Sequence, residues 1–319
     1  MQKILLFIAS LFYFNSLFAK DEIKSWQGIH ETPLSRLEQQ FAEPPVEFAN
    51  HVIWGWEGKM DKKTICNDLD SIKKKGFRAV IFEAGYKLPF KYLSEEWFKA
   101  IRTGVLEAKK RGMKVWIIDE GKYPSGFAGG KFSQERPDLR MQALVIGDTI
   151  QIKRGEVMTN HKIAPEIISA VAVSTSGAPN RTVAINNGEI SFNAGLDDWK
   201  ILLVKSDFRT AVTRAVNNPN GGKDATNSLC DYLNPVAVQQ FIDWTHEQYK
   251  KYLGKELGTT VLGFRGDEPD YAHLPWTPSI VQTFKDTKGY DPTPYLASFF
   301  TASPTIQEQR VKADYWDVW

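Results

Sequence analysis

The segment FRGDEP at residues 264–269 contains two adjacent acids, Asp267 and Glu268, where a hydrophobic run stops. Two carboxyl groups at one place can carry acid/base chemistry, because one protonated carboxyl donates to a leaving group while a second carboxylate activates water. Glu268 is the better candidate acid, since its side chain is longer than that of Asp267 and Pro269 ends sheet pairing after it. Asp267 is expected either to disfavour ionisation of Glu268 or to contact the substrate. The alternative is a polar turn in which Asp267 pairs with Arg265.

Acids and aromatic residues also stand at the ends of three other predicted strands. They are Trp54, Trp56 and Glu57 after the first strand, Glu83 and Tyr86 after the second, and Asp119, Glu120, Tyr123 and Ser125 after the third. Because ligands gather at the carboxyl ends of parallel strands, we expect these residues to share one rim. Such a rim suits sugars, whose hydroxyl groups bind carboxylates and whose C–H faces lie on aromatic rings.

Each of these rim residues also has a structural interpretation. Trp54 and Trp56 lie two positions apart and so face the same side of a strand, where they form either a stacking platform or part of the core. Glu83 and Glu120 either bind sugar hydroxyl groups or hold neighbouring backbone amides. His273 follows the fourth predicted strand, where it either contacts substrate or lies in a surface loop.

Alternating strand and helix patterns must position this rim. Apolar runs predict strands near residues 51–56, 77–83, 113–119 and 260–266. Helical spacing predicts helices over 60–76, 94–112 and 234–258, the first two with Asp61 and Ser94 as N-caps. Strands that alternate with helices indicate βαβ units, so we expect the four strands to lie parallel and adjacent in that order.

The pattern changes over residues 142–206, where alternating apolar residues are separated by Gly, Asn and Pro. Such a pattern is typical of short antiparallel strands. This segment is therefore expected to form a compact β module inserted after the third strand of an α/β fold.

Residues 1–19 read as an export signal, because Lys3 precedes an apolar stretch that ends at Ala19. No cysteine lies near the expected cleavage point, so we expect a periplasmic or secreted protein with no membrane span after cleavage. Cys66 and Cys230 fall in unrelated segments and are expected to be free thiols.

Composition excludes some other functions. With 40 basic and 38 acidic residues the net charge is only +2, which gives no reason to expect a nucleic-acid partner. The five histidines show no close pair, so the sequence contains no identifiable metal-ligand motif. Ten Trp, eleven Tyr and nineteen Phe residues supply rings both for a core and for carbohydrate contacts.

Three segments resemble glycoside hydrolase family 106, the α-L-rhamnosidases. They are VIWGWEGKMDKKTICNDLDSIKKKGFRAVIFEAG, EAKKRGMKVWIIDEGKYPSGFAGG and GFRGDEPDYAHLPWTPSIVQTFKDTKGYDPTPYLASFF. The third segment is the most specific, because Pro-Trp-Thr-Pro is followed by Gly-Tyr-Asp and Tyr-Leu. The resemblance covers the chain from about residue 44 onward.

The resemblance implies a partial (β/α)8 TIM-type barrel of about four βα units, with the β module inserted after strand three. It also implies inverting hydrolysis of α-L-rhamnosyl linkages in plant or microbial polysaccharides, with calcium as a possible cofactor. On this basis the expected domains are a signal peptide, a lead-in segment, the first part of the barrel, the β module and the barrel continuation, at 1–19, 20–45, 46–141, 142–206 and 207–319.

The family's second carboxylate is expected from a strand beyond the fourth. We therefore expect the chain to be either part of a longer enzyme or a degenerate copy that binds carbohydrate without cleaving it. The aromatic segment YWDVW at 315–319 is expected to pack on barrel elements beyond the chain.

Overall fold

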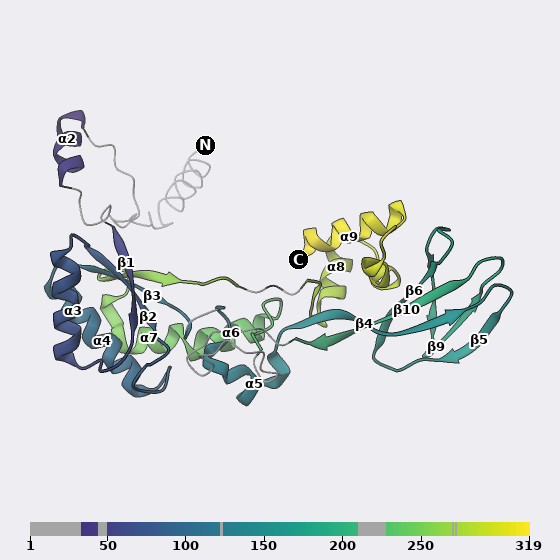
Figure 1. Ribbon diagram of the computed structural model, residues 1–319, viewed down its shortest axis with the longest axis horizontal. Helices are drawn as coiled ribbons and strands as arrows, with labels where there is room; N and C mark the ends of the chain where they lie inside the picture. Colours follow the sequence, from purple (N-terminus) through teal and green to yellow (C-terminus); the bar gives the residue numbers. More distant parts are fainter. Residues whose placement is uncertain (1–32, 44–49, 122–123, 210–227, 270, 272) are drawn as a thin grey trace, which may run out of the picture.

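The computed structural model describes residues 33–43, 50–121, 124–209, 228–269, 271 and 273–319. These residues form an elongated α/β molecule, with a parallel sheet at one end and antiparallel sheets at the other (Figure 1). The expected signal peptide lies outside the described residues, as does Tyr123. No helix among the described residues is long and apolar enough to cross a membrane.

The parallel sheet has four strands in the order β1-β2-β3-β11. Their bounds are His51–Trp56, Ala79–Ala84, Lys114–Ile118 and Val261–Arg265. All three pairings are parallel, so the predicted order and direction are confirmed. The burial patterns of the two middle strands differ: β2 is buried along almost its whole length, as a continuous apolar run predicts, whereas β3 alternates between half-buried and buried residues up to Ile117.

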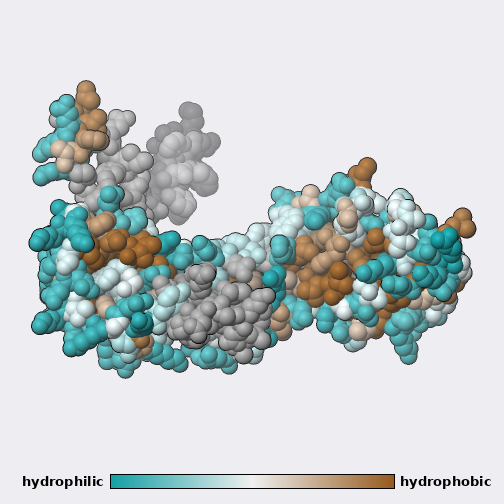
Figure 2. All heavy atoms as spheres, viewed as in Figure 1, coloured by the Kyte–Doolittle hydropathy of each residue, from teal (hydrophilic) through white to brown (hydrophobic). Residues whose placement is uncertain are grey.

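Helices α3 (Lys62–Lys74), α4 (Glu95–Lys110) and α7 (His246–Leu253) supply the side chains that pack on one face of this sheet. The predicted caps are present. Asp61 accepts a hydrogen bond from the Thr64 amide at 2.9 Å, and Ser94 accepts one from the Trp97 amide at 3.3 Å. Apolar surface also gathers over this end of the molecule (Figure 2), where β1 leaves Ile53 48% exposed.

The predicted helix over 234–258 is interrupted, which corrects the expectation of one continuous helix. Helix α6 (Pro235–Trp244) ends at Thr245, α7 begins at the next residue, and η4 (Gly254–Glu256) follows. Thr245 has φ −116° and ψ −83°, outside the helical region, and its hydroxyl donates to the Phe241 carbonyl at 2.6 Å. Apolar periodicity runs through such a break because both helices bury the same side.

The second part of the molecule is antiparallel, as the alternating pattern of residues 142–206 predicts. One sheet has the order β12-β4-β10-β6-β7 and the other has the order β5-β9-β8. The strands are β4 (Gln142–Ile152), β5 (Val157–Lys162), β6 (Ile167–Ser174), β7 (Arg181–Thr182), β8 (Ile185–Asn186), β9 (Glu189–Asn193), β10 (Trp199–Phe208) and β12 (Pro275–Trp276). Ile190 and Phe192 of the small sheet pack with Trp199 and Ile201 of the large sheet in one core.

The C-terminal elements pack on the other face of the large sheet. These elements are α8 (Ile280–Lys288), η5 (Thr293–Phe300) and α9 (Ile306–Val318), and Figure 1 shows them beside β4, β6 and β10. Tyr315 is fully buried there with Leu144 and Val204, and its hydroxyl donates to the Pro275 carbonyl at 2.5 Å. This corrects the expectation that the last aromatic segment packs on barrel elements, because the β module already offers an apolar face. Shorter elements complete the chain: α2 (Leu34–Ala42), η2 (Ala128–Gly130), α5 (Lys131–Glu135) and η3 (Pro137–Leu139).

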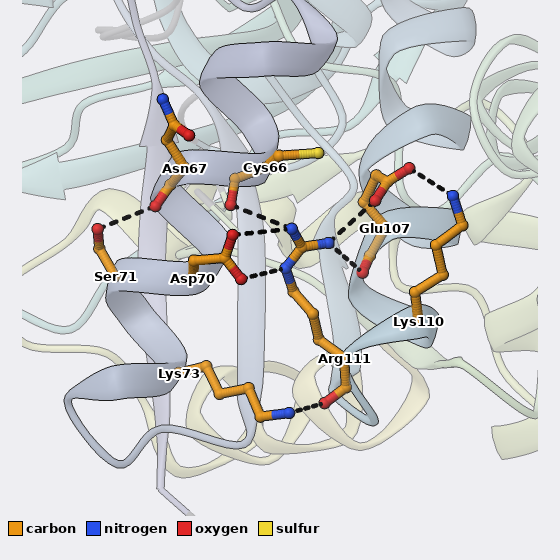
Figure 3. Close-up of polar contacts among 8 residues, drawn as sticks. All are labelled: Cys66, Asn67, Asp70, Ser71, Lys73, Glu107, Lys110 and Arg111. Carbon is orange, nitrogen blue, oxygen red and sulfur yellow. Dashed lines mark hydrogen bonds and ion pairs between the residues drawn. The ribbon is translucent and has the colours of Figure 1, made fainter.

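An arginine at the end of α4 fastens α3 to α4 (Figure 3). Arg111 donates to both carboxylate oxygens of Asp70 at 2.8 and 3.0 Å, and to the carboxylate of Glu107 at 2.9 Å. Lys110 donates to the other oxygen of Glu107 at 2.7 Å. The hydrogen bonds from Lys110 and Arg111 lower the pKa of Glu107 to about 2.

We expect Arg111→Ala to lower the Tm by a few degrees, because the nearly buried Glu107 loses one of its three cationic partners, the other two being Lys62 and Lys110. The stabilisation by Glu107 should be complete above its unfolded pKa of about 4.5 and disappear as the pH falls towards 2. Thermal unfolding at pH 7 and pH 3 measures both effects. Arg78→Ala is the matched control, since Arg78 is exposed and donates to the backbone carbonyls of Lys73 and Phe77. Equal Tm values for the two variants would contradict this role.

Candidate functional site

The candidate site begins at the carboxyl end of β3 with Asp119, whose side chain is nearly buried. One carboxylate oxygen, Oδ1, accepts a hydrogen bond from the Ser125 hydroxyl at 2.7 Å. The other, Oδ2, lies 3.7 Å from Nε2 of His246. Burial raises the pKa of Asp119, while the Ser125 hydrogen bond and the His246 charge act against that rise.

The interruption between α6 and α7 places His246 beside this acid. Its Nδ1 lies 2.9 Å from the Thr245 hydroxyl, and its ring packs edge-on against Phe264 with centroids 4.5 Å apart. Burial lowers the pKa of His246, whereas the nearby Asp119 charge raises it. The contact therefore joins an acid from β3 to a basic group from α7.

Ser125 joins the loop after β3 to the loop after β11. Its amide donates to the Asp267 carbonyl at 2.9 Å, and its hydroxyl oxygen accepts from the Asp267 amide at 2.7 Å. The Ser125 carbonyl also accepts a hydrogen bond from the Tyr232 hydroxyl. Gly126 lets Tyr232 approach, because its φ is +101° and a Cβ there would lie 2.7 Å from the ring. Four hydrogen bonds at one nearly buried residue thus fix the position of the candidate acids after β11.

Glu120 is fully buried and holds the glycine-rich loop that follows β3. Three backbone amides donate to its carboxylate, from Gly121 at 2.7 Å, Ala128 at 2.5 Å and Gly129 at 2.9 Å. Burial raises the pKa of Glu120 to about 7, although the three amides oppose that rise. The structure therefore matches the interpretation in which this acid holds backbone amides.

The pair that ends β11 divides between two environments. The Asp267 carboxylate is mostly buried and lies 3.3 Å from the Arg265 guanidinium, which is the pairing of the alternative interpretation. Glu268 is exposed, and its φ of +40° falls in the left-handed region that is strained for a residue with a side chain. The chain therefore turns sharply at Glu268, immediately before Pro269.

The predicted rim residues of β1 and β2 have different exposures. Trp56 is fully buried and contacts Trp54, Phe82 and Trp97 with ring centroids 5.0 to 5.7 Å apart, so core packing describes it. Trp54 is half-buried against the same core. A Cβ on Gly55 would lie 3.5 Å from Oε2 of Glu83, so the half-buried Glu83 points towards β1.

Glu57 and His273 are exposed. A Cβ on Gly85 would lie 2.3 Å from Cγ of Glu57, so the glycine permits this acid to stand close to the loop after β2. His273 lies in the loop between β11 and β12. The structure thus brings Asp119 and Asp267 together through Ser125, encloses Glu120 among backbone amides, and leaves Glu57, Glu268 and His273 at the surface.

His246 and Tyr232 are the functional candidates that the sequence did not reveal. His246 stands in a segment with strong helical patterning, where a histidine reads as an ordinary face residue, whereas Tyr232 stands in the turn before α6. The Thr245–His246 pair is the one local signal, because a β-branched hydroxyl residue can end a helix by bonding a preceding carbonyl.

Neither a metal-ligand motif nor a disulfide bond is predicted from the sequence. Within the part of the chain that the structure describes, no group of three or more His, Cys, Asp or Glu residues could hold a metal ion. Calcium, which the family resemblance implies, therefore stays a prediction. Cys66 and Cys230 are both free, as predicted.

Comparison with known proteins gives the class of fold and then the family resemblance. A rhamnosidase from Novosphingobium sp. PP1Y superposes with a TM-score of 0.57 over 90% of this chain, at 13% sequence identity. The chain therefore shares the fold of part of that protein. A family model described as alpha-L-rhamnosidase, that of glycoside hydrolase family 106, matches residues 160–302 and confirms the resemblance to that family.

A curated relative from Formosa agariphila carries the name "Putative beta-glucuronidase". It is 23% identical over 86% of this chain. The chain spans 28% of the length of that relative and 44% of the solved rhamnosidase.

Proposed function

We propose that this chain forms part of a glycoside hydrolase that cleaves α-L-rhamnosyl linkages by acid/base catalysis with inversion. The cluster of Asp119, Glu120 and Asp267 at adjacent carboxyl ends of β3 and β11 carries the proposal. Burial raises the pKa of Asp119, and perturbed carboxyl groups at strand ends are typical of catalytic sites in α/β folds. The rhamnosidase family match supports the substrate class.

In this proposal Glu268 is the general acid. Ser125 makes two hydrogen bonds to the backbone of Asp267, the residue before Glu268. The backbone that carries the acid is therefore held in place, and its exposed carboxyl is accessible to a substrate. Inverting hydrolysis also needs a carboxylate about 6.5–9.5 Å away to activate water. Of the described acids at the other strand ends, Asp119, Glu83 and Glu57 are the candidates, because Glu120 is closed off by three amides.

The sugar itself would lie along the rim between these strand ends. Glu57 and Glu83 would accept hydrogen bonds from its hydroxyl groups, and the half-buried ring of Trp54 would contact a C–H face. Glu120 would hold the glycine-rich loop in place, and His273 would meet the leaving group from the surface. We further propose that four βα units of a (β/α)8 barrel carry the site, and that the protein is exported.

Carbohydrate binding without cleavage is the second candidate. Two observations favour it. Asp267 is paired with Arg265, and Glu268 is exposed to solvent and not enclosed in an active site. A binding protein would retain the rim contacts and lack turnover.

Hydrolysis of 4-nitrophenyl α-L-rhamnopyranoside tests the proposal, with the β-D-glucuronide as a second substrate because of the name of the relative. We expect turnover of the rhamnoside alone, with the β-anomer as the first product seen by ¹H NMR. Turnover of the glucuronide in its place would overturn the substrate class. Binding of rhamnose oligosaccharides without release of product would establish the second candidate.

A further inference from the structure

A chain of contacts runs from the break between α6 and α7 to the acid at the end of β3. Thr245 is fully buried at the break, and its hydroxyl oxygen lies 2.6 Å from the Phe241 carbonyl and 2.9 Å from Nδ1 of His246. On the other side of the same ring, Nε2 lies 3.7 Å from Oδ2 of Asp119. The proposed chemistry gives the half-buried His246 no role, although it stands beside a candidate catalytic acid.

The hydrogen bonds of Thr245 determine which nitrogen of His246 always carries a hydrogen. A hydroxyl group has a single hydrogen, and an oxygen 2.6 Å from a carbonyl oxygen must donate it there, because two acceptors at that distance would repel. The Thr245 oxygen therefore accepts from the ring, so Nδ1 carries a hydrogen in both the neutral and the charged form. Nε2 is then the nitrogen that gains and loses a proton, and it is the one that faces Asp119.

The Asp119 carboxylate likewise has one oxygen that is occupied and one that faces the histidine. The Asp267 amide donates to the Ser125 hydroxyl oxygen, which leaves the hydroxyl hydrogen to be donated to Oδ1 of Asp119. Oδ2 faces Nε2 of His246. Without a proton, these two atoms would bring their lone pairs together in a nearly buried place, and a single proton between them removes that repulsion.

The charges around this contact come from three elements. Burial lowers the pKa of His246, while the charges of Asp119 at the end of β3 and of Glu247 on the same helix raise it. Burial raises the pKa of Asp119, the His246 charge lowers it, and the Asp267 charge after β11 raises it further. β11 also contributes the ring of Phe264, which does not titrate. His246 and Asp119 therefore each oppose the effect of burial on the other, as expected of one coupled pair.

We propose that Asp119 and His246 share one proton between Oδ2 and Nε2 and act as a single acid–base pair, in which Asp119 activates water and His246 is its positioning residue. As the water oxygen bonds to the anomeric carbon, one water proton passes to Asp119. Glu268 gives its own proton to the leaving oxygen as the glycosidic bond breaks. The pair then releases one proton to solvent, and solvent restores the proton of Glu268. This inference rests on the proposed function, and it selects Asp119 from the candidate carboxylates.

Nitrogen NMR of the His246 ring tests the shared proton in the whole chain without any need for turnover, and His246→Gln assigns the signals. We expect Nδ1 to keep its hydrogen throughout the titration and only Nε2 to titrate. Asp119→Asn should lower the pKa of His246, because the carboxylate charge that raises it is lost. The ring signals of His161, which is exposed on β5, should be the same in both proteins.

Two substitutions of Thr245 give a matched test that leaves both members of the pair in place. Thr245→Val removes the oxygen that accepts from Nδ1, so the neutral His246 ring should place its hydrogen partly on Nε2. Thr245→Ser keeps the hydroxyl and should keep the hydrogen on Nδ1. A wild-type neutral ring with its hydrogen on Nε2, or the same His246 titration in Asp119→Asn as in the wild type, would overturn the pair.

The pH profile of His246→Gln tests the part of the pair in water activation. Its kcat for 4-nitrophenyl α-L-rhamnopyranoside should fall by roughly tenfold, a part of the about 10²–10⁴-fold contribution of a positioned base. The acid limb of its profile should move to higher pH, since the His246 charge that favours ionised Asp119 is gone. His161→Gln makes the same substitution at the exposed histidine of β5 and should leave the rate and the profile unchanged.

The outcomes separate the pair from the proposed function. The expected ring signals together with the shifted acid limb support both. The expected ring signals in a protein that hydrolyses no rhamnoside support the shared proton and overturn the proposed function, with the part of the pair in it. The expected ring signals with an unchanged acid limb in His246→Gln overturn the choice of Asp119 as the carboxylate that activates water.

Discussion

Glu268→Gln should lower the turnover of an unactivated rhamnoside by a factor on the order of 10²–10⁴ in a form of the protein that hydrolyses rhamnosides. The substitution keeps the size of the side chain and removes the proton that the leaving oxygen needs. A rhamnoside with a strongly acidic leaving group departs with little protonation, so its turnover should fall far less. Steady-state kcat values for an alkyl rhamnoside and for a dinitrophenyl rhamnoside measure the difference.

The structure supplies the control for this experiment. Glu57→Gln removes another exposed carboxyl at a strand end, and it should affect both substrates alike, because neither sugar binding nor water activation depends on the leaving group. If Glu268→Gln also reduces both substrates to the same extent, Glu268 binds sugar or activates water and is not the acid. Glu268 has φ +40°, so Glu268→Gly provides a second variant that removes the carboxyl and relieves the backbone.

The parallel sheet could be predicted because the residues that determine its strands and the starts of its helices are neighbours in the sequence. Continuous apolar runs identify β2 and β3 as strands, and capping residues mark the first turns of α3 and α4. Each cap bond forms within three residues, at Asp61 and at Ser94. Where neighbouring residues decide the conformation, the sequence predicts it correctly.

The interruption at Thr245 could not be predicted in the same way. Both helices keep one buried side, so the apolar periodicity continues across the break, and the contact of His246 with Asp119 joins residues far apart in the sequence. The position of α9 could not be predicted for a similar reason. Its apolar side chains require a cover, but only the folded chain shows that the large antiparallel sheet supplies it.

Glu120 shows why a strand-end acid alone does not define a role. Its position on the rim predicts either substrate binding or an amide contact, and the sequence favours neither. The folded chain shows the amide contact: three backbone amides donate hydrogen bonds to the Glu120 carboxylate, which is fully buried. The conformation of residues 128–130, with positive φ at all three, brings two of those amides to the acid.

Burial of Glu120 should make the folded state less stable as the pH rises. The pKa of Glu120 is raised from 4.5 to about 7 in the folded chain, so between these values the folded state holds a proton that the unfolded state has released. The free energy of unfolding should therefore fall between about pH 4.5 and pH 7 and stay level above, with a Glu120 contribution on the order of 3 kcal/mol. Chemical denaturation of the wild type at pH 5 and pH 8 measures the total change.

Glu120→Gln isolates this contribution, because glutamine does not titrate. Other buried acids, including Asp119 and Asp231, also have a raised pKa and change stability in the same direction, so the wild type alone gives only their sum. The fall in stability from pH 5 to pH 8 should be smaller in the variant than in the wild type. The glutamine amide group would also face the Ala128 amide, donor against donor, so the variant should be less stable than the wild type at pH 5. The exposed Glu57→Gln should leave the pH dependence unchanged, and an equal slope in Glu120→Gln and the wild type would show that Glu120 is ionised in the folded chain at both pH values.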